Sequence, residues 1–148
     1  MSQTIRLGGT HLRKGTYSFI EQTLLDYNEI DKHIKNRVEE ITYPVSIPDD
    51  NIGGSSAGTI SNPTERLAVT IIDDMLISNL NRTKNVVDEV LEGLEPDARK
   101  VIYLYYIDSP RKYTWTGVAL ESNFSESYCR KIRNVVFEKI AKKLGMPI

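Results

Sequence analysis

Apolar side chains recur every three or four residues along most of this 148-residue chain, and no segment shows sustained alternation of apolar and polar residues. The first spacing places apolar groups on one face of a helix, whereas half-buried strands need the second. The sequence therefore predicts an all-α fold. N-terminal helices are expected to connect through a Gly/Ser/Pro-rich loop to a long helix, which a C-terminal helix-turn-helix follows.

The expected organisation has three parts. Residues 1–15 are predicted to form a flexible arm, residues 16–93 a helical N-terminal region for oligomerisation or partner contact, and residues 94–148 a DNA-binding domain. A first helix is predicted from about Tyr17 to Thr42, with an apolar a/d seam that has one polar break at Asp31. A helix packed on its own domain and a coiled coil both fit this seam, because fewer than four clean heptads are present.

Residues 44–64 are rich in glycine, serine and proline and are predicted to form a loop. After this loop, Asn62 or Thr64 can cap a second helical stretch over residues 64–92. The length of that stretch predicts either one bent helix or two helices that meet near Asn79–Asn81.

The C-terminal domain is predicted to contain a helix over residues 96–107 and then a helix-turn-helix over residues 115–134. Asn123 stands where such a turn needs a positive φ, which asparagine tolerates better than other residues with a side chain. Ser125 is placed to cap the second helix. The residues expected to face inward are Val118, Ala119, Cys129, Ile132 and Val136.

Charge is divided unevenly, since residues 1–98 carry a formal net charge of −7 and residues 99–148 carry +6. This division favours phosphate contacts by the C-terminal third and protein contacts by the rest. A helix in a major groove needs donors for base edges and cations for phosphates. The residues predicted to contact double-stranded DNA are Arg111, Lys112, Thr114, Ser125, Glu126, Ser127, Tyr128, Arg130, Lys131, Arg133 and Asn134. Arg133 lies nearer the packed face, so it is assigned to a phosphate contact or to packing.

Other classes of protein have little support in the sequence. Cys129 is the single cysteine and the two histidines are far apart, so no disulfide, zinc site or other cofactor is expected. No apolar run approaches the roughly 20 residues that span a bilayer, and a cytoplasmic protein is expected. No nucleophile–base pair or carboxylate pair points to an enzyme.

The segment Leu94–Tyr106 together with the helix-turn-helix resembles region 4 of sigma factors. More closely, residues 15–145 resemble the RinA family of phage transcriptional activators, and the match is specific as a combination of separated pieces. The matching pieces are Tyr17–Asp26, Ile47–Gly54, Pro63–Val69, Thr114–Ala119 and Ile140–Gly145.

This resemblance implies a phage or prophage protein that activates late genes for packaging and morphogenesis in the bacterial host cytoplasm. Residues 125–130 are less basic than that family leads one to expect and are closer to the ArpU-type phage regulators. Two alternatives stay open: a DNA-packaging protein similar to small terminase subunits, and a sigma-like adaptor that binds host RNA polymerase.

Overall fold

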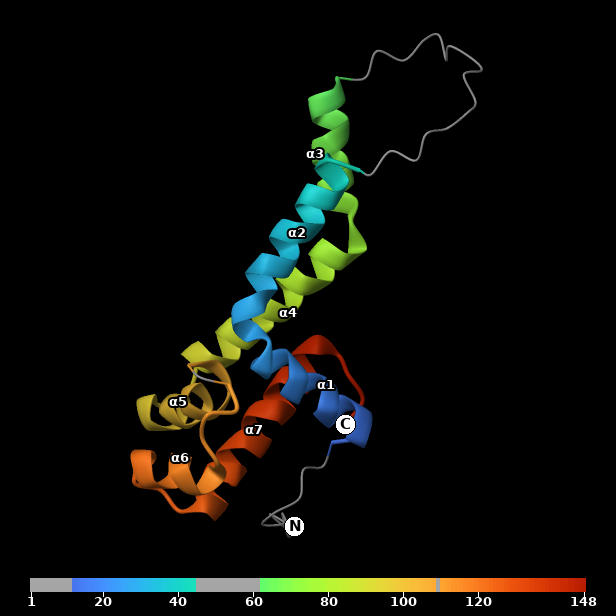
Figure 1. Ribbon diagram of the computed structural model, residues 1–148. Coiled ribbons are helices and arrows are strands. Elements are labelled where there is room, and N and C mark those ends of the chain that lie inside the picture. The colour runs from blue at the N-terminus through green and yellow to red at the C-terminus, as the bar shows by residue number, and fades with distance from the viewer. Residues whose placement is uncertain (1–11, 45–61, 109) are drawn as a thin grey trace. The chain divides into compact units, whose positions relative to one another are not determined.

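The computed structural model describes residues 12–44, 62–108 and 110–148, and within them it contains seven α-helices and no strand (Figure 1). The all-α prediction is therefore confirmed. The chain divides into two compact units, residues 1–29 with 83–148 and residues 30–82. This division differs from the boundary expected at residue 93, because the first helix packs with the C-terminal helices.

The first unit is built around its last helix, α7, on which α1, α5 and α6 all pack. Its elements are α1 (Lys14–Leu25), the 3-10 turn η1 (Tyr27–Glu29), the end of α4 (Met75–Glu92), α5 (Pro96–Ile102), the π-helical segment η2 (Tyr103–Ile107), α6 (Trp115–Ser122) and α7 (Glu126–Leu144). Each fully buried aliphatic or aromatic side chain contributes roughly 1.5–3 kcal/mol. The largest of them are Ile20, Leu24, Leu91, Ile102, Tyr106, Phe137 and Ile140.

The first predicted helix, over residues 17–42, is interrupted by η1, and α2 (Ile30–Thr42) begins after it. The prediction of one continuous helix over residues 17–42 is therefore wrong. A long-range hydrogen bond holds the interruption in place, because the side-chain amide of Asn28 donates to the carbonyl oxygen of Ile107 at 2.7 Å. Such a contact leaves no trace in the local apolar spacing, which continues through the turn.

The second unit contains α2, α3 (Pro63–Asp73) and the start of α4, and α2 packs on α3. Asn62 caps α3 as predicted, because its side-chain oxygen accepts a hydrogen bond from the backbone N–H of Thr64 at 3.0 Å. Pro63 occupies the first turn, where its missing N–H costs no helical hydrogen bond.

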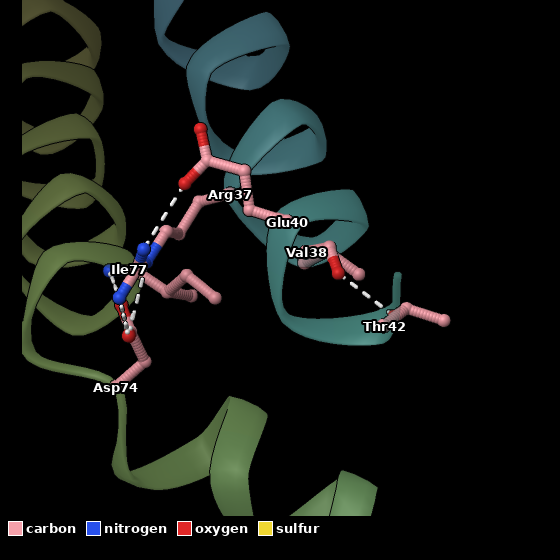
Figure 2. Close-up of polar contacts among 6 residues, drawn as sticks. All are labelled: Arg37, Val38, Glu40, Thr42, Asp74 and Ile77. Carbon is pink, nitrogen blue, oxygen red and sulfur yellow. Dashed lines mark hydrogen bonds and ion pairs between the residues drawn. The ribbon is translucent and has the colours of Figure 1, made fainter. Parts of the chain in front are cut away.

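Asp74 separates α3 from α4. Its backbone is extended, and its carboxylate caps α4 by accepting the N–H of Ile77 at 3.0 Å. Arg37 of α2 donates to the same carboxylate at 2.8 and 3.1 Å (Figure 2). The stretch over residues 64–92 is therefore two helices, which was one of the two predicted outcomes. The predicted junction near Asn79–Asn81 is wrong, because the cap and the ion pair fix the break at Asp74.

Two predicted segments fall mainly outside the described residues: most of the loop over 44–64 and most of the arm over 1–15. Where the arm is described it belongs to the fold, since Leu12 is buried and α1 begins at Lys14. The arm therefore does not extend as far as residue 15.

Candidate nucleic-acid interface

A short turn joins α6 to α7. Thr114 caps α6 by accepting the N–H of Gly117 at 3.2 Å, and Asn123 ends that helix in the left-handed conformation, with φ 61° and ψ 22°. Ser125 then caps α7, because its hydroxyl oxygen accepts the N–H of Tyr128 at 3.1 Å. Both the positive φ at Asn123 and the cap at Ser125 are confirmed, and together they set the direction in which α7 leaves the turn.

One side of α7 is fixed in the core of its unit. Cys129, Val136 and Ile140 are fully buried, and Ile132 is 7% exposed. Val118 of α6 is also fully buried, while Ala119 is half-buried and packs against this core. The inward orientation predicted for these residues is confirmed, so α7 has a fixed rotation about its own axis.

The other side of α7 is largely exposed, and most of its charges are cationic. We call its residues the exposed stripe of α7: Ser127, Tyr128, Lys131, Val135, Lys139 and Lys142, of which Lys131 alone is half-buried. From Tyr128 onward they follow one another at steps of three or four, which is one face of a helix. Lys139 and Lys142 were not among the predicted contacts, because a position near the helix C-terminus explains a lysine by the dipole alone. Their spacing from Lys131 is the signal that could have found them.

Arg130 and Glu126 lie beside the exposed stripe and pair with each other. The Arg130 guanidinium lies 3.6 Å from the Glu126 carboxylate, and both side chains remain more than two-fifths exposed. The hydroxyl of Thr116 donates to the same carboxylate at 3.1 Å, so Glu126 also ties α6 to the first turn of α7. This pair holds Arg130 near the start of α7 without burying it.

Arg133 is half-buried against the aromatic rings of Tyr17 and Trp115. Its guanidinium carbon lies 5.5 Å from the ring centroid of Tyr17 and 5.3 Å from that of Trp115. Trp115 in turn stacks on Tyr105, with centroids 3.9 Å apart and planes at 10°. The guanidinium also donates two hydrogen bonds of 3.1 Å to the side-chain oxygen of Asn134. Of the two roles expected for Arg133, packing is the one that the structure shows.

Asn134 was expected on the exposed face of α7, and that placement is wrong, because it is only 9% exposed. Phe137 and Ala141 follow it at steps of three and four and are fully buried. Tyr17 of α1 packs on Phe137, with ring centroids 5.0 Å apart. Helix α1 therefore covers a second side of α7, a contact between distant segments that the sequence pattern does not reveal.

The residues just before α6 are exposed and cationic. Arg111 has a positive φ of 65°, and the Lys112 ammonium lies 5.4 Å from the ring centroid of Tyr113. Lys100, which also precedes α6, donates to the carbonyl oxygen of Glu121 at 3.0 Å. Arg111 and Lys112 thus remain exposed just before α6, whereas Lys100 is hydrogen-bonded to the C-terminal end of α6.

Two comparisons with known proteins match most of the chain. The family model described as "Protein of unknown function (DUF722)" matches residues 17–142. The protein named "Transcriptional activator rinA" from Staphylococcus phage phi11 is 22% identical over 134 residues, which cover 90% of this chain and 94% of that protein. No solved structure matches the chain. Among the helices of the described segments, none has the length and apolar character needed to cross a membrane.

Proposed function

The chain belongs to the DUF722 family, a RinA-like phage family, and on that premise we propose that it is a sequence-specific DNA-binding regulator of transcription. In this proposal α6, the turn at Asn123 and α7 form the DNA-binding helix-turn-helix. The observation that carries the proposal is the exposed stripe of α7, with its cations on a helix whose opposite side is held in the core. A recognition helix needs this division between a packed side and a side free to enter the major groove.

The N-terminal half of α7 reads the bases in this proposal, since recognition helices contact base edges with their first residues. Arg130 and Lys131 donate to guanine acceptors, and the Ser127 hydroxyl donates or accepts. The backbone N–H groups of the first turn, next to Ser125, meet a phosphate. The cations assigned to other phosphates are Arg111, Lys112, Lys139 and Lys142. Phosphate contacts of this kind fix the register of the protein on the duplex.

The biological role proposed here is activation of the late packaging and morphogenesis genes of a phage or prophage, in the cytoplasm of the bacterial host. The relative from phage phi11 is named a transcriptional activator, which supports activation over repression. An activator acts on RNA polymerase, so we propose the host enzyme as a second partner. It would bind surfaces other than the exposed stripe of α7.

Fluorescence anisotropy tests the proposal, with labelled duplexes that tile the phage or prophage genome encoding the chain. We expect wild-type protein to select one or a few of these duplexes. Arg130→Ala and Lys131→Ala are expected to weaken that specific binding by roughly tenfold or more, as for loss of one base contact. The salt dependence of binding should become shallower by about one unit of slope for each phosphate contact removed, as in Lys139→Ala.

Lys35→Ala is the matched control, because Lys35 is an exposed lysine of α2 far from α7 in sequence and its loss removes the same charge. It should bind like wild type. The proposal is overturned if wild-type protein binds no duplex at low salt, or if Arg130→Ala, Lys131→Ala and Lys35→Ala all bind the selected duplex equally well.

A further inference from the structure

Helix α3 carries apolar side chains on two opposite sides. It packs on α2, and its half-buried apolar side chains are Leu67 and Ile71. Val69 lies about 160° around the helix from both of them, at 100° per residue. Val69 is 55% exposed and its neighbour Ile72 is 75% exposed. A helix that is apolar on both sides is normally covered on both.

The first turn of α4 also carries exposed apolar side chains. Met75 is 76% exposed and Leu76 is 50% exposed, so four large apolar side chains within eight residues face solvent. Clusters of exposed apolar side chains mark sites of association, whereas apolar residues scattered singly over a surface do not. We call Val69, Ile72, Met75 and Leu76 the α3–α4 patch.

The unit that carries this patch has little core of its own. Among its described residues, the buried apolar side chains are Ile30 and Ile77. Units with so small a core usually depend on a disulfide, a metal or oligomerisation for stability. The single cysteine, Cys129, belongs to the other unit, so a disulfide within this one is excluded. Among the described residues, no group of three or more histidine, cysteine or acidic side chains is placed to hold a metal ion.

The charges beside the patch are self-complementary. Arg66 and Asp73 are exposed and lie seven residues apart on α3, both within about 60° of Val69. If two copies of α3 pair antiparallel about a two-fold axis, Arg66 of each copy lies opposite Asp73 of the other. A parallel pair would instead set like charges against each other. Arg66 and Asp73 therefore favour the antiparallel orientation in an isologous interface.

We propose that this face is a homodimer interface, in which α3 pairs antiparallel with α3 of a second copy and the α3–α4 patch forms the apolar centre. The inference does not depend on DNA binding. One consequence for DNA recognition does rest on the proposed function. A two-fold dimer would present two copies of α7 to a pseudo-palindromic operator.

Sedimentation velocity of the purified full-length protein, across the micromolar range, tests the proposal. Wild-type protein is expected to shift from monomer to dimer as concentration rises. Ile72→Gln should move that transition to at least tenfold higher concentration. Leu120→Gln is the matched control, because Leu120 is 76% exposed on α6, and it should dimerise like wild type. Circular dichroism checks that both variants keep their helix content.

A charge exchange tests the orientation without touching an apolar residue. Arg66→Asp and Asp73→Arg each place like charges across the proposed interface twice, and each should weaken dimerisation by roughly tenfold. The double variant with both changes restores opposite charges and should recover most of the wild-type affinity. Wild-type protein that stays monomeric overturns the proposal. So does a dimer that Ile72→Gln and both single charge reversals leave unchanged.

Discussion

Replacing Arg133 with alanine should destabilise the first unit rather than remove a direct DNA contact. The change deletes a guanidinium that lies over two aromatic rings, those of Tyr17 and Trp115. Each cation–π contact contributes about 0.5–2 kcal/mol, depending on how far water is excluded. The change also leaves the buried side-chain oxygen of Asn134 without the two hydrogen bonds that it accepts, which costs about 1 kcal/mol or more.

Together these losses amount to about 2–5 kcal/mol. For a chain of this size, 1 kcal/mol corresponds to about 2–4 °C in the melting temperature, so Arg133→Ala should lower Tm by about 4–20 °C. Differential scanning calorimetry measures this directly. Arg130→Ala is the matched control, because Arg130 is exposed and makes one i,i+4 ion pair worth about 0.3–0.5 kcal/mol. If the two variants melt at the same temperature, the contacts of Arg133 with Tyr17, Trp115 and Asn134 do not stabilise the first unit.

Single substitutions test the α6–α7 turn, the core of the first unit and the α3–α4 junction. Asn123→Ala should cost about 1–2 kcal/mol because alanine tolerates a φ of 61° poorly, whereas Asn123→Gly should be neutral or better; urea unfolding decides. Cys129→Ser should cost roughly 1 kcal/mol or more in thermal unfolding, since its hydroxyl enters a fully buried site where Ser122 is the neighbouring partner, and an unchanged Tm would argue against that packing. Two hydrogen bonds lower the pKa of Asp74 below its usual 3.8, of which the one from Arg37 has the larger effect and the one from the Ile77 N–H the smaller. The stabilisation of the α3–α4 junction by the Asp74 carboxylate is therefore complete above about pH 4 and lost as the pH falls further. The backbone amide of Ile77 should lose protection from hydrogen exchange over this pH range in wild type, and should show no such loss in Asp74→Asn.

The sequence predicted the α6–α7 turn well because its chemistry is local. A positive φ at Asn123 and a cap at Ser125 depend on residues within one turn of each other. The all-α class followed from apolar spacing for the same reason. Local chemistry could also have placed the junction at Asp74, since aspartate is a strong cap, but the longer apolar pattern continues across it and hides the break.

Contacts between distant segments were not predictable in this way. The burial of Asn134 depends on α1, which lies more than a hundred residues earlier in the chain and covers that side of α7. The interruption of the first predicted helix depends on Ile107, whose carbonyl oxygen holds Asn28. For Asn134 the sequence predicts the right helix with the wrong surroundings, and for residues 17–42 it predicts one helix where the structure has two. Tertiary packing overrides a local periodicity in both cases.

Site-directed cleavage of bound DNA tests whether α7 enters the duplex. Cys129 is fully buried and should not react, so Ser127→Cys provides one exposed thiol on the exposed stripe of α7 for a DNA-cleaving iron chelate. We expect strand cuts clustered inside the sequence that the protein protects, and none from wild-type protein treated with the same chelate, because Cys129 is buried. Bound DNA that is left intact by the chelate at residue 127, or is cut only outside the protected sequence, would argue against entry of α7 into the duplex.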